Sequence, residues 1–320
     1  MTKKSCWILT EGMAGTENQC LGLAEALDFD PEMKRLCPRW PWRWLPIGLW
    51  PAPLAAQNPT AAPLTPPWPD VLISAGRKSV PVALAIKKKS GGRVFGVHLL
   101  NPYVSPDRFD LVATPRHDGL EGDNVLVTEG ALTRITKARL DDALDVHGGR
   151  LAALPRPRLA VLLGGTSKHF QFTERAAGEL ARLLRAMAVE TGGSLMITAS
   201  RRTGAGVVAR LRAGLENVPM EIWEGDGANP YFAYLAAADA ILVTNDSVSM
   251  ASEAATTGKP LYVFNLEGKA KKFDAFHENL RARGIARPFD GTLEKWTYEP
   301  LADTGRVAQG VCKRLAERTK

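Results

Sequence analysis

Short apolar runs recur along this chain, and each leads into a turn of small or polar residues. The first run, at residues 5–10, is followed by the loop 11–15 and then by apolar residues at helical spacing through Leu27. Strands buried on both faces appear as continuous apolar runs, because helices cover both sides of a parallel sheet. A strand, a turn and a helix form the repeating unit of such a sheet. The alternation therefore predicts an α/β fold.

The same alternation occurs in two halves of the chain. We expect strands at 71–74, 94–98, 111–113, 124–128, 159–163, 195–199, 240–244 and 261–264. Residues 137–157 are polar and end in Pro155-Arg156-Pro157, which favours a domain junction in or near this stretch. The sequence thus predicts two facing Rossmann-like domains with a cleft between them, at residues 1–140 and 155–300. A C-terminal helix at 301–320 is expected near the junction.

Residues 33–69 differ in composition from the rest of the chain. They hold ten of the 22 prolines and five of the eight tryptophans, and their charged residues are Lys34, Arg35, Arg39 and Arg43. So many prolines exclude a long helix or a central strand, so we expect an irregular excursion. Tryptophan and basic residues together favour an anionic membrane surface. The segment is therefore expected to dock on a membrane or an amphipathic acceptor, unless its tryptophans pack onto their own domain.

The net charge of +7 favours an anionic partner. We expect this partner to be a nucleotide or anionic lipid rather than nucleic acid. The four cysteines form no CxxC pair, which indicates reduced thiols. No stretch approaches the roughly 20 apolar residues that a membrane span needs, and the N-terminal run is too short for a signal peptide. The sequence therefore predicts a cytoplasmic protein whose membrane contact, if any, is peripheral and on the inner face.

The loops after the strands of the second half carry the residues that suggest a ligand site, because open parallel sheets bind ligands beyond the carboxyl ends of their strands. These residues are Gly164, Gly165, Thr166, Ser200, Arg201, Arg202, Asn229, Asn245, Asp246 and Ser247, with Met250 and Glu253 on the helix that follows. Free glycine N–H groups at a helix start suit phosphate oxygens, and guanidinium groups suit a diphosphate. The Glu253 carboxylate can accept two hydrogen bonds from ribose hydroxyls. Together they predict a nucleotide-sugar site.

Each of these features also has a structural interpretation. A Gly-Gly pair is commonly just a turn, and Arg201 with Arg202 could form a solvated face. Asp246 or Ser247 could be only a helix N-cap. Glu253 could be an exposed helix residue.

Several phrases of the sequence resemble one protein family. They are LTEGMAGTENQCLGLAEAL, ISAGRKS, FDLVATPRHDG, NVLVTEGALTRI, ASRRTG and TNDSVSMASEAATTGKPLYVF, within about residues 5–290, and they are similar to the mitochondrial fission (elongated-mitochondria) protein family. The resemblance implies a GT-B-like fold. Plant members are implicated in recruiting a dynamin-like protein to mitochondria, so the resemblance leaves enzymatic activity open.

The phrase TNDSVSMASEAATTGKP is also similar to the donor-site helix of the enzyme that adds N-acetylglucosamine to the peptidoglycan lipid intermediate. There a glutamate in the place of Glu253 contacts the donor ribose. The sequence departs from the family at Glu11, where members often have Asp, so the acid is kept with a longer reach.

Inverting transfer needs a carboxylate or histidine that takes a proton from the acceptor hydroxyl. Glu11 follows the first strand, and His117 with Asp118 follows the strand at 111–113, so these three are the candidate catalytic residues. Glu11 could instead cap a helix, and His117 with Asp118 could form a turn. The stretch 76–78, Gly-Arg-Lys, also follows a strand and could hold an acceptor phosphate.

Several activities are excluded by missing motifs. No GxGxxG follows a strand and no GxxxxGK[ST] occurs, which argues against a dinucleotide cofactor and a P-loop NTPase. The pattern Asp28-Phe29-Asp30 follows a helix, and the histidines lack zinc-ligand spacing, so no metal and no cofactor other than the donor substrate are expected. The sequence predicts an inverting, metal-independent glycosyltransferase with an envelope or lipid-linked acceptor. The alternatives are a non-enzymatic membrane adaptor and a nucleotide-sugar epimerase.

Overall fold

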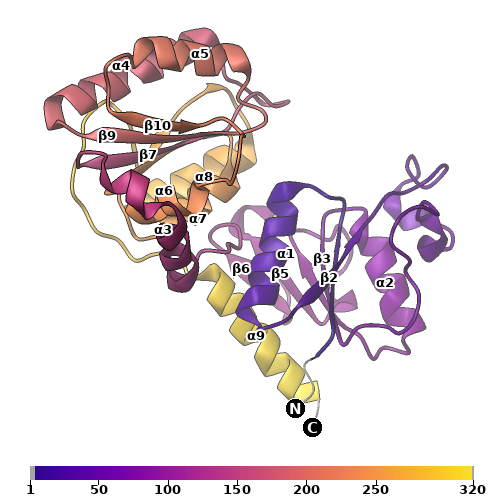
Figure 1. Ribbon diagram of the computed structural model, residues 1–320. Helices are drawn as coiled ribbons and strands as arrows, with labels where there is room; N and C mark the ends of the chain where they lie inside the picture. Colours follow the sequence, from indigo (N-terminus) through magenta and orange to yellow (C-terminus); the bar gives the residue numbers. More distant parts are fainter. Residues whose placement is uncertain (1–3, 319–320) are drawn as a thin grey trace. The chain divides into compact units, whose positions relative to one another are not determined.

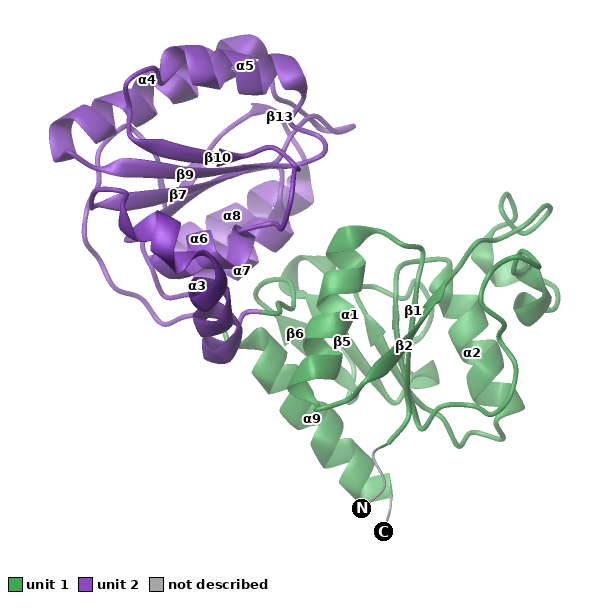
Figure 2. Cartoon of the chain, viewed as in Figure 1, with its two compact units in different colours: residues 1–134, 302–320 green, residues 135–301 purple. Residues whose placement is uncertain are grey.

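The computed structural model describes residues 4–318 and divides into two compact units. Unit 1 comprises residues 1–134 and 302–320, and unit 2 comprises residues 135–301 (Figure 2). Each unit has a parallel sheet of its own. The chain therefore returns to unit 1 at its C-terminus.

Unit 1 is a sheet with helices on both faces. Its elements are β1 (Cys6–Thr10), α1 (Ala14–Ala26), β2 (Pro31–Arg35), β3 (Val71–Ala75), α2 (Ser79–Lys89), β4 (Phe95–Leu99), β5 (Leu111–Pro115), β6 (Val125–Thr128) and α9 (Asp303–Arg318), with single-turn helices η1 (Ile47–Leu49), η2 (Pro53–Ala56), η3 (Pro106–Arg108) and η4 (Arg116–Asp118). The described strands are all parallel, in the order β2-β1-β3-β4-β5-β6 (Figure 1).

The alternation of side chains along β1 shows how the two faces of this sheet are covered. Ile8 packs in a cluster with Leu23 of α1 and Val307 of α9. Leu9, its neighbour, packs in another cluster with Ile86 of α2. Because successive side chains of a strand point to opposite faces, α1 and α9 cover one face and α2 covers the other.

Helix α9 is fixed at its start to the loop that follows β6. The Asp303 carboxylate accepts hydrogen bonds from the N–H groups of Glu129 and Gly130, at 3.1 and 2.9 Å. The Thr304 hydroxyl accepts one from the N–H of Thr133 at 2.8 Å. The first turn of α9 therefore lies against the last residues of unit 1 that precede unit 2 in the chain.

Unit 2 has the same layered architecture. Its elements are α3 (Lys137–Ala152), β7 (Arg158–Leu163), β8 (Phe170–Gln171), α4 (Glu174–Thr191), β9 (Ser194–Ala199), α5 (Ala205–Gly214), β10 (Met220–Trp223), α6 (Tyr231–Ala237), β11 (Ala240–Thr244), α7 (Val248–Thr256), β12 (Leu261–Phe264), β13 (Glu267–Gly268), α8 (Lys271–Ala282) and β14 (Ala286–Pro288). The described strands of its main sheet are parallel, in the order β10-β9-β7-β11-β12-β14, and β8 pairs with β13.

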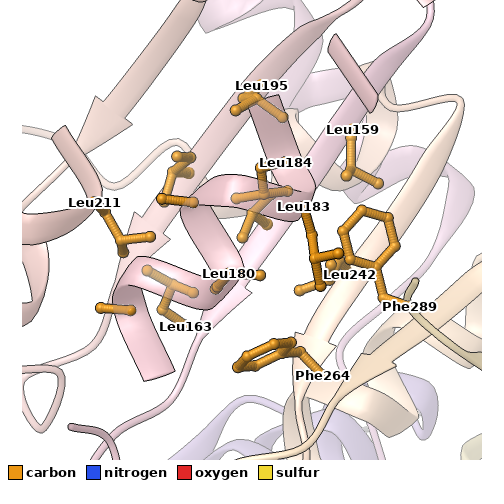
Figure 3. Packing of buried hydrophobic residues seen from close by; sticks show 14 of the residues in the cluster. Leu159, Leu163, Leu180, Leu183, Leu184, Leu195, Leu211, Leu242, Phe264 and Phe289 are labelled. Carbon is orange, nitrogen blue, oxygen red and sulfur yellow. The ribbon is translucent and has the colours of Figure 1, made fainter. Parts of the chain in front are cut away.

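The core of unit 2 lies on both faces of this sheet. Leu163 of β7 belongs to a cluster with Leu180 of α4, and its neighbour Leu162 belongs to one with Ala251 of α7 and Leu280 of α8. Figure 3 shows the first cluster, where leucines of α4, α5 and the sheet gather with phenylalanines. Burying one leucine fully contributes about 1.5–3 kcal/mol, so the central strands anchor the fold.

The sequence interpretation missed several elements, among them β2, β10, β14 and α3. The edge strands β2, β10 and β14 are only partly buried and so have no continuous apolar run. Helix α3 occupies residues that we expected to be a polar junction. It was missed because one narrow apolar stripe, Leu140, Ala143, Leu144 and Leu151, packs against the core of unit 2. The irregular excursion begins after Arg35 rather than at residue 33, because residues 31–35 form strand β2.

None of the helices within residues 4–318 is long and apolar enough to cross a bilayer.

Candidate functional site

In the sheet of unit 2, successive strands are added first on one side of β7 and then on the other side, which makes a topological switch point. From β7 the chain continues to β9 and β10 on one side, whereas β11, β12 and β14 follow on the other side of β7. The loops that leave β7 and β11 diverge there, and ligands of open α/β sheets bind at such a point. These loops begin at Gly164 and Asn245, so the structure brings together two of the predicted ligand segments.

Asp246 ties these two loops together. Its side chain is fully buried, and its Oδ2 lies 2.9 Å from both the N–H of Gly165 and Nη2 of Arg202. The Thr244 hydroxyl donates a hydrogen bond to Oδ1 at 2.7 Å and accepts one from the N–H of Gly164 at 2.8 Å. A buried charge is tolerated when it is paired in this way. Asp246 therefore organises the loops and orients Arg202.

Gly164 and Gly165 are required by close packing rather than as open N–H groups. A Cβ atom on Gly164 would lie 2.0 Å from Oδ1 of Asp246, and one on Gly165 would lie 2.0 Å from the carbonyl oxygen of Arg202. The N–H of Thr166 also donates to that carbonyl oxygen, at 3.1 Å. The expectation of free N–H groups at a helix start is therefore wrong, since all three N–H groups are bonded and α4 begins only after β8.

Other predicted ligand residues also bond within unit 2. Ser200 Oγ donates a hydrogen bond to the carbonyl oxygen of Gly164 at 2.8 Å. Three other side chains accept hydrogen bonds from backbone N–H groups: Asn229 Oδ1 from Tyr231 at 3.0 Å, Asn245 Oδ1 from Leu266 at 2.9 Å, and Ser247 Oγ from Met250 at 3.3 Å. Ser247 is the N-cap of α7, which is the structural alternative that we considered. These contacts shape the loops and leave fewer polar groups for a ligand.

Positive charge remains accessible at this edge of the sheet. Arg201 is exposed, and the side chain of Arg202 is 44% exposed although it pairs with Asp246. Helix α7 begins nearby with Val248, directly after the β11 loop, and the N-terminus of a helix carries a partial positive charge. The combination can attract the phosphates of a nucleotide.

Glu253 of α7 is not an exposed helix residue. It is only 7% exposed, and the Tyr231 hydroxyl of α6 donates a hydrogen bond to its Oε2 at 2.5 Å. Burial first, and then the adjacent carboxylate, raise the pKa of Tyr231 well above its usual value. The tyrosine therefore stays protonated and acts as a permanent donor that orients the carboxylate.

Two residues of this region were not among the predicted site residues. Tyr231 is separated from Glu253 by 22 positions in sequence, and only the packing of α6 and α7 on one face of the sheet explains their contact. Buried His277 of α8 has its Nε2 at 2.9 Å from the carbonyl oxygen of Asn245. Burial lowers the pKa of His277, which favours a neutral imidazole that donates this hydrogen bond.

In unit 1, Glu11 lies at the corresponding switch point, between β1 and β3. Its Oε1 accepts a hydrogen bond from the N–H of Lys78, and its Oε2 pairs with the ammonium group of Lys78, both at 3.2 Å. The carboxylate thus binds the residue that precedes α2, but it is the N-cap of neither α1 nor α2, whose N-cap residues are Met13 and Lys78. Its role as a base stays a prediction.

His117 and Asp118 lie after β5, in the single-turn helix η4. The Nε2 of His117 is 4.0 Å from Oδ1 of Asp118, whose Oδ2 accepts a hydrogen bond from the Thr114 hydroxyl at 3.1 Å. Since β3 and β4 lie between β1 and β5, Glu11 is about three strand spacings, or roughly 14 Å, from this pair. The three catalytic candidates therefore do not form one cluster, and their chemistry stays a prediction.

No group of three or more His, Cys, Asp and Glu side chains within the described residues is arranged to hold a metal ion. Cys6, Cys20, Cys37 and Cys312 are free thiols. Burial raises the pKa of Cys6 to about 12, so this thiol is inert at neutral pH.

Two Rossmann-like units, each with a parallel sheet and a switch point, define the GT-B fold, as predicted from the sequence. Solved structures agree with this assignment. UDP-GlcNAc 2-epimerase of Methanocaldococcus jannaschii, in complex with UDP-GlcNAc and UDP, matches with a TM-score of 0.53 and 13% identity over 97% of this chain and 99% of that one. The glycotransferase of kitacinnamycin matches with a TM-score of 0.55 and 12% identity over 100% and 92% of the two chains.

The chain belongs to the mitochondrial fission ELM1 family, whose model matches residues 14–315. The mitochondrial fission protein ELM1 of Arabidopsis thaliana is 36% identical over 278 residues, which are 78% of this chain. This chain spans 65% of the length of that plant relative. The resemblance found in the sequence is therefore confirmed.

Proposed function

We propose that unit 2 binds a nucleoside-diphosphate sugar at the β7–β11 switch point, and that the protein transfers the sugar to an envelope or lipid-linked acceptor. The observation that carries the proposal is the Tyr231–Glu253 pair. Glutamate is rarely buried, and here the Tyr231 hydroxyl fixes the orientation of the buried carboxylate, which suits a role in binding. Accepting hydrogen bonds from a vicinal diol, such as that of ribose, is one such role.

In this proposal the ligand lies along the carboxyl edge of the sheet. The phosphates bind near the start of α7 with Arg201, where the helix dipole and the guanidinium favour negative charge. The ribose hydroxyls bind Glu253, which Tyr231 orients. Asp246 does not touch the phosphates, because like charges repel, and instead it holds Arg202 in position.

The proposed chemistry needs no metal ion. As the glycosidic bond breaks, negative charge grows on the leaving diphosphate, and the same positive groups stabilise it in the transition state. The donor sugar is a substrate, so no other cofactor is required. The proposal places the protein in the cytoplasm at the inner face of a membrane, where a lipid-linked acceptor is accessible.

A nucleotide-sugar epimerase is the second candidate, because an epimerase is among the solved structures that share the fold. It would use the same donor site but would need no acceptor. The two activities differ in one observable: an epimerase converts the nucleotide-sugar in the absence of any acceptor, whereas a transferase consumes it only when an acceptor is added.

The test is a thermal-shift panel of nucleoside diphosphates and their sugars, applied to wild type, Arg201→Ala and a matched control, Arg182→Ala. Arg182 is an exposed arginine of α4. A ligand at 100 times its Kd stabilises the folded protein by about 2.7 kcal/mol, which is readily seen as a rise in Tm. We expect one nucleotide to stabilise wild type and Arg182→Ala, and to stabilise Arg201→Ala less. A non-enzymatic adaptor would respond to none of the panel.

A further inference from the structure

Outside the donor site, the segment 36–69 of unit 1 stands out by its content of proline and tryptophan, and it is named here the Pro/Trp segment. Its base is closed by hydrogen bonds from the N–H of Arg39 to the carbonyl oxygen of Ala56 at 2.8 Å and from the N–H of Asn58 to that of Cys37 at 2.9 Å. Its single-turn helices η1 and η2 contact α2, beside which the segment lies in Figure 1. The segment is therefore a folded platform.

The tryptophans of this segment divide into two groups. Trp42, Trp50 and Trp68 turn inward and pack in the core cluster that includes α2. The Nε1 atoms of Trp42 and Trp50 donate to the carbonyl oxygens of Pro51 and Leu45, at 2.5 and 3.1 Å. Packing onto the same domain, our alternative interpretation, therefore holds for Trp50, which is 7% exposed, and in part for Trp42.

The other group faces solvent. Trp40 and Trp44 are 79% and 80% exposed, and Leu49 of η1 is 69% exposed. Large apolar side chains that gather on one exposed segment indicate a surface that binds something. An indole ring combines an apolar body with one N–H donor, which suits the boundary between lipid and water.

A cavity of about 560 Å³ lies between the Pro/Trp segment and α2. Its walls are mostly apolar and include Leu54, Leu64, Trp68 and Ala85, and its lining also includes one cation, Lys89. A hydrocarbon chain suits the apolar walls, and a phosphate group suits the lysine. The lining therefore complements an amphiphile with an anionic head.

The charged residues of the Pro/Trp segment are all positive. No acidic residue occurs in segment 36–69, whereas Arg43 and, at the end of α2, Lys88 and Lys89 are exposed. Lys87 differs, since it pairs with Asp110 at 2.8 Å. Basic residues near an anionic leaflet each contribute about 1 kcal/mol to binding.

We propose that the Pro/Trp segment and the end of α2 form a docking surface for an anionic lipid bilayer, with one hydrocarbon chain of a phospholipid in the cavity. Trp40 and Trp44 insert at the interface, and Arg43 and Lys89 contact the head groups. This surface belongs to unit 1 and uses no residue of the donor site. Its failure would therefore leave nucleotide binding by unit 2 unchanged.

The test is co-sedimentation of the full chain with phosphatidylcholine vesicles, with and without phosphatidylglycerol. We expect wild type to bind the anionic vesicles at low salt and Trp40→Ser/Trp44→Ser to remain in the supernatant. The matched control is Val146→Ser/Val189→Ser, which changes two side chains that are 74% and 76% exposed in unit 2, and it should bind as wild type does. Arg43→Gln/Lys89→Gln should weaken binding about fivefold per residue, and salt should reduce this difference.

The cavity is tested with lipids that carry bromine on their acyl chains and quench nearby tryptophans. The Trp68→Phe variant identifies the part of the fluorescence quenching that comes from Trp68 in the cavity. Ala85→Phe fills the cavity, so it should reduce this part of the quenching while vesicle binding persists. Wild type that stays in the supernatant with anionic vesicles overturns the proposal and points to a protein partner. Equal binding by the tryptophan variant and the valine control overturns it as well.

Discussion

The hydrogen bond between Tyr231 and Glu253 allows a quantitative prediction of the free energy of unfolding. Tyr231→Phe removes one donor from a carboxylate that is 7% exposed, without changing the shape of the half-buried ring. A hydrogen bond to a charged group contributes about 1.5–3 kcal/mol. We therefore expect the free energy of unfolding of unit 2 to fall by about that amount. Glu253→Ala should also destabilise unit 2, because this side chain is buried.

The assay is urea denaturation followed by circular dichroism, on wild type, Tyr231→Phe, Glu253→Gln and the double variant. The double-mutant cycle isolates the coupling between the two side chains. Phe232→Leu is a control on the neighbouring position of α6, where the side chain is half-buried. A coupling energy below about 0.5 kcal/mol would refute the argument, since it would mean that the hydroxyl does not hold the carboxylate.

Other variants test further parts of the account. Burial lowers the pKa of His98 from 6.5 to about 3, so below pH 6.5 the unfolded chain binds a proton that folded unit 1 does not. The free energy of unfolding should then fall by about 1.6 kcal/mol between pH 6.5 and pH 5 in urea titrations, and His98→Leu should lack this component. Gly165→Ala should lower the Tm strongly because of its clash with the carbonyl of Arg202, whereas Gly149→Ala, with open space around it in α3, should raise it slightly. Equal Tm changes would contradict this interpretation.

The strands that could be predicted are those buried on both faces. The apolar run at 240–244 is strand β11 with the same bounds. Every residue of this strand is buried, which favours an apolar sequence. Strand β10, whose residues are all half-buried, has no such run. Helix α3 was missed because a few apolar side chains are enough to anchor it, and most of its other residues are polar or charged.

The candidate site could be located from the sequence more readily than its contacts could. Strand order decides that the loops at Gly164 and Asn245 lie side by side, and the rule on carboxyl ends of strands finds that edge. The sequence does not show that the N–H of Gly165 is bonded to Asp246, since this contact spans 81 positions. A pattern of residue types therefore identifies a polar edge, but packing decides which groups remain open to a ligand.

Calorimetric titration with nucleoside diphosphates and the matching monophosphates tests the central claim most directly. We expect one diphosphate to bind wild type. Glu253→Gln should weaken the binding of both nucleotides of that base, because both carry the ribose. Arg201→Ala should weaken the diphosphate several-fold more than the monophosphate, because only the diphosphate has a second phosphate to pair with. If no nucleotide of the panel binds wild type, or if Glu253→Gln binds as wild type does, the donor site is not where we place it.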